Sequence, residues 1–177
     1  MLLYVMRHGP AEDRAATGLD VDRALTEEGR ARVRRVAEEL RELRGGAPIA
    51  RVLASPLLRA RETAEIAAEL GLIEAGAAGA EVELHEDLTL DADPPVALVA
   101  ARGAGGADAL LIGHQPSMEA LVRELAPEPA SSLASSPLAA GFCTGMVVAL
   151  EPTPGEGTPP APLRWQVRLV IDPRRLP

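Results

Sequence analysis

The sequence predicts an α/β fold, a three-layer α/β/α sandwich around a mostly parallel sheet of about six strands. Short, continuous apolar runs typical of buried strands alternate with longer segments whose apolar residues recur at helical spacing. The last two apolar runs have no helical segment between them, which predicts a C-terminal antiparallel hairpin. The 177 residues, 47% of them hydrophobic, suffice for one sizeable core, so we expect a single domain over residues 1–177.

The first strand and the first helix have clear boundaries in the sequence. Residues 2–6 form a short apolar run and predict a buried strand. Residues 9–23 contain proline, glycine and scattered charges, and we expect a loop there. Thr26 is a suitable N-cap for a helix that two acidic residues open and that Gly45 and Gly46 end.

A second strand and helix follow directly. Residues 49–54 predict a strand, after which Ser55 is expected to cap a helix with Pro56 in its first turn. That helix should extend to about Leu70 and place Arg59 near its N-terminus. Free backbone N–H groups and the positive end of the helix dipole favour an anion at that position.

The second half of the chain continues the alternation and adds two low-complexity segments. The expected elements are a short strand over 81–84, helices over 94–102 and from Pro116, and strands over 109–112, 146–150 and 165–171. Residues 130–140 and 152–162 are rich in small residues and proline, and we expect loops there.

Polar side chains follow three of the predicted strands, where each strand ends. Arg7-His8-Gly9 follows the first strand, residues 55–59 follow the second, and His114 follows the strand over 109–112. Ligands of open α/β sheets bind at the carboxyl ends of the strands. An arginine beside a histidine suits phosphate oxygens and a nucleophile aimed at phosphorus. This edge of the sheet is therefore the candidate site.

Each of these residues also has a structural interpretation when it is taken alone. His8 could be a core histidine, His114 a hydrogen-bonded histidine at a strand end, and Arg59 an exposed helix residue paired with Glu62 or another acid. His85 lies in a charged loop and we interpret it as incidental. Because the three histidines show no ligand spacing, we expect neither a metal nor another cofactor.

Composition excludes several classes of function. The formal net charge of −8 argues against nucleic acid as a partner, since nucleic-acid binders carry basic surfaces. A single cysteine excludes an internal disulfide and fits a reducing compartment. The first apolar run is too short for a signal peptide and no apolar stretch is long enough to cross a bilayer. We therefore expect a cytoplasmic protein with no membrane partner.

The ordered set of motifs resembles a known family. Arg7-His8-Gly9, the stretch over residues 55–63 and Gly113-His114 are similar to the signature of the histidine phosphatase superfamily, which has a phosphoglycerate-mutase-like fold. The stretches over residues 23–29 and 86–89, together with the small size of the chain, resemble the SixA-like phosphohistidine phosphatases.

The resemblance implies a role for each candidate residue. His8 would attack phosphorus and become a phosphohistidine, which water would then hydrolyse. Arg7 and Arg59 would bind the phosphoryl oxygens, His114 would donate a further hydrogen bond, and Arg23 would be an additional phosphate contact. These roles agree with phosphoryl transfer, in which preorganised cations stabilise charge on the equatorial oxygens.

The general acid and the substrate are left open by the sequence. Asp87 is the nearest match to the catalytic acid of many superfamily members, with Glu86 beside it, and both could equally be solvated loop residues. The short segment between Arg59 and His114 leaves no room for a long lid, which favours an open pocket. A phosphohistidine on a phosphorelay or phosphocarrier protein is the expected substrate. A small phosphomonoester, or phosphate binding without catalysis, are the alternatives.

Overall fold

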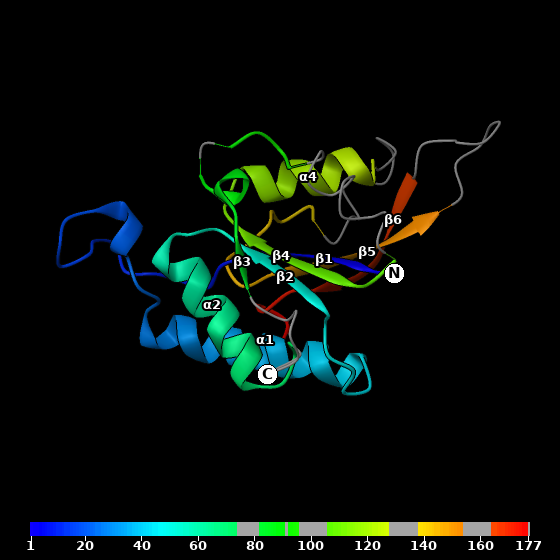
Figure 1. Ribbon diagram of the computed structural model, residues 1–177, viewed down its shortest axis with the longest axis horizontal. Coiled ribbons are helices and arrows are strands. Elements are labelled where there is room, and N and C mark those ends of the chain that lie inside the picture. Colours follow the sequence, from blue (N-terminus) through cyan, green and yellow to red (C-terminus); the bar gives the residue numbers. More distant parts are fainter. Residues whose placement is uncertain (74–81, 91, 96–105, 128–137, 154–163, 177) are drawn as a thin grey trace.

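The computed structural model describes residues 1–73, 82–90, 92–95, 106–127, 138–153 and 164–176. A six-stranded sheet lies between two helical layers, with α1 and α2 on one face and α4 on the other (Figure 1). The helices are α1 (Glu27–Leu43), α2 (Leu58–Glu69) and α4 (Ser117–Leu125), with 3-10 turns η1 (Asp20–Asp22) and η2 (Glu86–Leu88). The strands are β1 (Leu3–Arg7), β2 (Arg51–Ala54), β3 (Glu83–Leu84), β4 (Ala109–Gly113), β5 (Val147–Thr153) and β6 (Arg164–Ile171).

The strand order is β3-β2-β4-β1-β5-β6. β1 and β2 each pair in parallel with β4, and β2 also pairs in parallel with β3. β5 pairs antiparallel with β1 and with β6. The predicted α/β/α sandwich, with its mostly parallel sheet and C-terminal antiparallel hairpin, is therefore confirmed, and the carboxyl ends of β1 to β4 share one edge.

Aliphatic side chains on both faces of the sheet form the core. On β1, Tyr4 and Met6 contribute to the cluster that includes residues of α1 and α2, whereas Leu3 and Val5 contribute to the cluster that includes residues of α4. This alternation follows from the period of two along a strand. A central strand buried on both faces explains why residues 2–6 read as one continuous apolar run.

The start of α1 brings this helix against the loop that follows β1. The Thr26 hydroxyl accepts a hydrogen bond from the backbone N–H of Gly29 at 2.9 Å, which confirms the predicted N-cap. A Cβ on Gly29 would lie 1.9 Å from the carbonyl oxygen of Pro10, so this approach requires glycine. The contact holds the backbone just after the Arg7-His8-Gly9 segment.

The prediction that Ser55 caps the second helix is wrong. α2 begins at Leu58 with Leu57 at the N-cap, and no side chain caps it. The Ser55 hydroxyl instead contacts the Leu57 N–H at 3.3 Å and the His114 ring at 2.9 Å. Long-range pairing with a histidine has replaced the local capping bond that the sequence favoured.

Other predicted boundaries shift by a few residues or lie outside the described part. β2 begins at Arg51, because residue Ile49 makes only an isolated bridge to Ile73. β5 continues to Thr153 and so takes the first two residues of the loop predicted over 152–162. Parts of four predicted elements lie outside the described residues. They are residues 154–162 and 130–137 of the two predicted loops, residue 81 of the predicted short strand, and residues 96–102 of the helix predicted over 94–102.

Candidate active site

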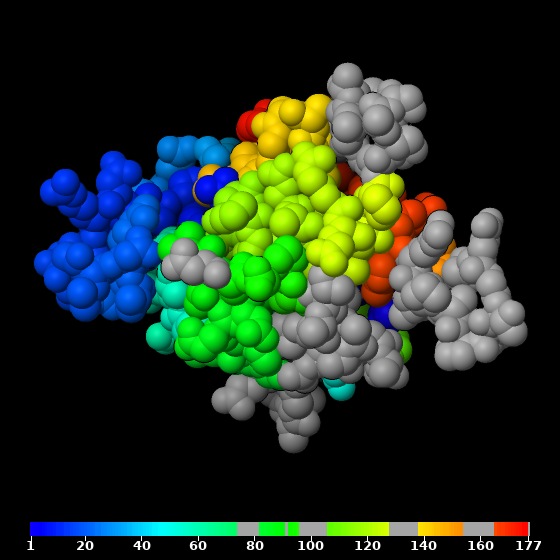
Figure 2. Space-filling model, turned by 90° about the horizontal axis from the view of Figure 1, so that it is seen from above, coloured from blue at the N-terminus to red at the C-terminus, as the bar shows by residue number. Residues whose placement is uncertain are grey.

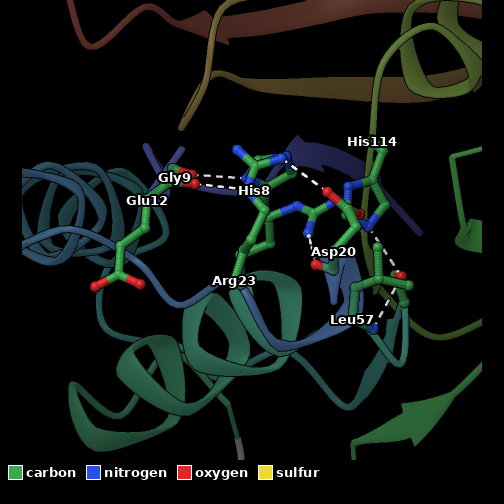
Figure 3. Close-up of polar contacts among 9 residues, drawn as sticks. His8, Gly9, Glu12, Asp20, Arg23, Leu57 and His114 are labelled. Carbon is green, nitrogen blue, oxygen red and sulfur yellow. Dashed lines mark hydrogen bonds and ion pairs between the residues drawn. The ribbon is translucent and has the colours of Figure 1, made fainter. Parts of the chain in front are cut away.

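The carboxyl edge of the sheet gathers four of the residues selected from the sequence. Arg7 ends β1 and His8 follows it, His114 follows β4, and Arg59 lies in the first turn of α2. Figure 3 shows His8 and His114 in the same group of polar side chains. The backbone N–H of His8 donates to the Gly113 carbonyl at 3.1 Å, so the strand pairing of β1 and β4 continues to the site. The two histidine rings lie 4.7 Å apart between centroids.

His8 is held in an orientation that suits a nucleophile. Its Nδ1 lies 2.6 Å from the Gly9 carbonyl oxygen, and an oxygen acceptor there places the ring proton on Nδ1. The lone pair is then on Nε2, the nitrogen that can attack phosphorus. Burial, together with the charges of Arg59 and Arg7, lowers the pKa of His8 to about 4. The ring is therefore neutral at neutral pH.

His114 is fully buried, and its two ring nitrogens have different surroundings. Nε2 lies 2.9 Å from the Ser55 hydroxyl, whereas Nδ1 has no hydrogen-bond partner among the described residues. When the Ser55 O–H donates to Nε2, the ring proton is on Nδ1, which becomes a free buried donor. Burial, together with the neighbouring His8, lowers the pKa of His114 to about 3. A buried donor without a partner fits an anionic ligand.

Arg59 is almost fully buried, with 2% of its side chain exposed. Its guanidinium donates from Nη1 to the Asp20 carbonyl at 2.9 Å and from Nη2 to the Asp20 carboxylate at 3.0 Å. Arg23 donates to the other Asp20 carboxylate oxygen at 2.8 Å and from Nε to the Glu12 carbonyl. The structural alternative holds only in part: Arg59 does pair with an acid, Asp20, but it is buried and not exposed, and Glu62 accepts instead from Arg30.

Arg7 has one satisfied and one free donor group. Nη1 donates to the Phe142 carbonyl at 2.9 Å, and Nε is buried without a hydrogen-bond partner in the described structure. Burial lowers the pKa of Arg7 below its usual value. The carbonyl contact orients the guanidinium, and the unpartnered N–H marks Arg7, like His114, as a group that can still bind an anion.

Thr63 and Ser55 are positioning residues that sequence reasoning missed. The Thr63 hydroxyl is buried on α2, accepts from the Gly9 N–H at 3.2 Å and donates to the Arg59 carbonyl at 2.7 Å. One hydroxyl therefore joins the segment of His8 to the turn that carries Arg59. The sequence signals for Thr63 were its place at the end of the motif over residues 55–63 and its position four residues after Arg59, one helical turn away on the same face.

Gly9 is needed for space rather than for a left-handed turn. A Cβ there would lie 2.5 Å from Val33 Cγ2 and 3.1 Å from the Gly29 carbonyl oxygen. The backbone φ of Gly9 is not positive, so the backbone conformation itself does not require glycine at this position. The glycine instead lets β1 end directly against α1.

Glu86 and Asp87, the candidates for the general acid, lie on η2, which follows β3 at the same edge of the sheet. Both acids are exposed on η2, and the Asp87 carboxylate lies 4.0 Å from His85 Nδ1, with its side chain 68% exposed. Neither makes a hydrogen bond or an ion pair with His8 or His114 within the described part of the chain. In the described ranges there is also no group of three His, Cys, Asp or Glu residues arranged to hold a metal.

The rim of the site carries exposed apolar side chains. Leu19 and Val21, 59% and 53% exposed, flank Asp20, and Leu84 and Leu90 flank η2. Figure 2 shows the segment with η1 (blue) projecting beside the segment after β3 (green). A hollow of about 340 Å³ lies within the η1 segment and is lined by Asp20, Arg23 and neighbours from residue 13 onward.

Comparison with known proteins identifies the class. The model of the histidine phosphatase superfamily (branch 1) matches residues 3–91. An uncharacterised protein of Picosynechococcus sp. is 41% identical over 128 residues, which are 67% of this chain and 68% of that protein. The chain therefore belongs to the histidine phosphatase superfamily, and the predicted family is confirmed.

Solved structures place the chain beside one group within this class. The tungstate complex of the protein histidine phosphatase SixA has a TM-score of 0.73 and 28% identity, and 98% of each chain is covered. A SixA from Nakamurella multipartitia, described as a putative phosphohistidine phosphatase, has a TM-score of 0.66 and 26% identity, over 97% of this chain and 95% of that one. The family and these neighbours support phosphatase activity, and the SixA-like resemblance is confirmed. Among the described residues, no helix has the length and apolar character needed to span a membrane.

Proposed function

We propose that this protein is a protein phosphohistidine phosphatase that acts through a covalent phosphohistidine on His8. The observation that carries the proposal is the buried histidine pair, in which His8 Nδ1 is fixed by Gly9 and the His114 ring lies 4.7 Å away with a free nitrogen. A neutral His8 with its Nε2 lone pair available is the form that attacks phosphorus.

The reaction has two displacements on phosphorus. In the first, His8 Nε2 forms a bond to phosphorus as the bond to the substrate nitrogen breaks, and the substrate ring, protonated on its other nitrogen, leaves as neutral imidazole. In the second, water attacks phosphorus on the side opposite His8 Nε2 and loses a proton to solvent. The bond between phosphorus and Nε2 breaks, and inorganic phosphate is released. His8 returns to its neutral form with Nδ1 still bonded to Gly9.

Arg7, Arg59, Arg23 and His114 supply electrostatic stabilisation in this proposal. Phosphoryl transfer spreads charge over three equatorial oxygens, and preorganised donors in a buried site stabilise that charge most effectively. The burial of Arg59 and the unpartnered donors of Arg7 and His114 support these assignments.

Two features favour a protein phosphohistidine over a small phosphomonoester. An alkoxide leaving group needs a proton from an acid, whereas an imidazole that is already protonated does not. Asp87, the candidate for that acid, is exposed beside His85. Exposed leucines and a valine on η1 and around η2 offer apolar contacts that a protein surface can cover. The 28% identity to SixA over nearly the whole chain agrees with this choice.

The substrate class is tested by competition between substrates. Purified protein is incubated with a histidine-phosphorylated carrier protein and, separately, with small sugar phosphates, and kcat/KM is compared. The proposal expects a marked preference for the phosphoprotein. A preference for the monoesters, together with loss of sugar phosphate turnover in Asp87→Asn, would establish the phosphomonoesterase alternative.

The nucleophile is tested with a matched pair of histidine variants. His8→Gln should abolish turnover and the trapping of acid-labile, base-stable phosphate on the protein, with the fold retained by circular dichroism. His85→Gln removes a histidine outside the site and should leave both unchanged. Phosphate binding by the wild type without trapping or turnover would favour a binding module over an enzyme.

A further inference from the structure

The free site already contains an anion, the carboxylate of Asp20. Its Oδ1 accepts from Arg23 Nη1 at 2.8 Å and its Oδ2 accepts from Arg59 Nη2 at 3.0 Å. Two arginines that each donate to one oxygen of the same anion are the arrangement expected for a bound phosphoryl group. Figure 3 shows Asp20 among His8, Arg23 and His114.

The charge of Asp20 acts on His114 as well as on the arginines. The charge of Asp20 raises the pKa of His114, against the larger lowering effects of burial, His8 and Arg59. Hydrogen bonds to Arg23 and Arg59 lower the pKa of Asp20, so the group is ionised at neutral pH. A permanent negative charge at this place opposes the approach of a phosphate dianion.

The segment that carries Asp20 is held to the body of the protein by few contacts. η1 contains no buried residue, and Leu19 and Val21 beside Asp20 are more than half exposed. The Asp20 side chain itself is 49% exposed. Moving this turn away from Arg59 therefore costs little buried apolar surface. The bonds that join Asp20 to α2 are those from Arg59 to its carbonyl and to its carboxylate, whereas Arg23 lies at the end of η1 and belongs to the same segment.

We infer that Asp20 occupies the phosphoryl position of the free enzyme and must be displaced by the substrate, so that it sets how strongly the site binds phosphate. The inference rests on the proposed function in taking Arg59 as a phosphate ligand. Asp20 then acts as a specificity determinant, because free phosphate has only the arginines with which to displace it. A phosphoprotein gains further contacts with Leu19 and Val21 on the same turn.

An alternative role for Asp20 predicts the opposite change in phosphate affinity. If Asp20 served to hold Arg59 and Arg23 in position for phosphate, its removal would weaken phosphate binding. Asp20→Asn removes the charge with almost no change in shape. Asp22→Asn is the matched control, since Asp22 lies on the same turn and accepts from the Thr17 hydroxyl at 2.6 Å.

The test is calorimetric titration of the full chain with inorganic phosphate at fixed pH and ionic strength. Asp20→Asn should bind phosphate about tenfold more tightly than the wild type, the change expected when one charge-assisted pair no longer has to be broken. Asp22→Asn should stay within about twofold, because an exposed charge is screened. Asp20→Ala should change in the same direction as Asp20→Asn.

Equal or weaker binding by Asp20→Asn and Asp20→Ala, relative to Asp22→Asn, would overturn the inference. The absence of binding by every variant would overturn it as well. Trapping of phosphate on His8 is measured separately. If the wild type shows no trapping and no turnover, but Asp20→Asn binds phosphate more tightly, the proposed function is contradicted and the inference is still supported.

Discussion

Replacement of Thr63 by valine tests the link between the nucleophile and the phosphate-binding helix. The change keeps the shape of the side chain and removes the buried hydroxyl that bonds the Gly9 N–H and the Arg59 carbonyl. Because the Gly9 N–H then has no partner, the free energy of unfolding should fall by about 2 kcal/mol, within the usual cost of a buried unsatisfied donor. For a chain of this size that is a fall in Tm of about 4–8 °C.

The activity of the same variant separates positioning from stability. The Gly9 carbonyl orients His8, so freeing the Gly9 segment should lower kcat about tenfold, or about 1.4 kcal/mol, with a smaller change in KM. Thr63→Ser keeps the hydroxyl and should retain most of the activity. Urea unfolding and steady-state kinetics on a histidine-phosphorylated carrier provide the two measurements.

The control is Thr17→Val, which removes an exposed hydroxyl. Its free energy of unfolding should stay within about 0.5 kcal/mol of the wild type, as is usual for surface substitutions. The reasoning is refuted if Thr63→Val is as stable as Thr17→Val and retains full kcat.

Three further expectations concern the same edge of the sheet. Ser55→Ala leaves His114 Nε2 without a donor and should lower kcat/KM about tenfold in steady-state assays; an unchanged value would exclude a role for the hydroxyl. The pKa values of His8 and His114, about 4 and 3, lie below the usual 6.5, so the unfolded chain takes up protons first as the pH falls. The free energy of unfolding should then drop by about 2 kcal/mol per histidine between pH 7 and pH 5, and His8→Gln should show about half of this dependence; equal stability of the wild type at both pH values would contradict the lowered pKa values. Gly9→Ala, whose Cβ meets Val33, should lower the free energy of unfolding by about 1–3 kcal/mol, with partial recovery in the double variant with Val33→Ala; an unchanged Tm of Gly9→Ala would show that the site can expand.

Most elements could be predicted because their signals are local. Residues 2–6 are apolar in an unbroken run, and Thr26 followed by acidic residues caps α1 as expected. The Ser55 cap failed for a physical reason that a local pattern cannot contain. A serine before a proline can cap a helix, but His114 competes for the same hydroxyl from 59 residues away.

The candidate site was predictable to the extent that strand ends determine it. Arg7, His8 and His114 follow β1 and β4, and parallel pairing brings their strand ends to one edge. The acidic residue that contacts the arginines was not predictable. Asp87 was the candidate from the sequence and lies exposed beside His85, while Asp20 lies on a turn with no sequence signal of its own.

By itself, the sequence determined the α/β order of elements, the family, and which side chains end the strands, because period, capping and motifs are properties of neighbouring residues. Only the tertiary structure decided the contacts between distant segments: Asp20 with Arg59 across 39 positions, and Gly9 with Thr63 across 54. Those contacts depend on how the loop after β1 packs against α1 and α2. They hold the Gly9 segment, whose carbonyl orients His8, and they decide which anion the arginines hold before a substrate arrives.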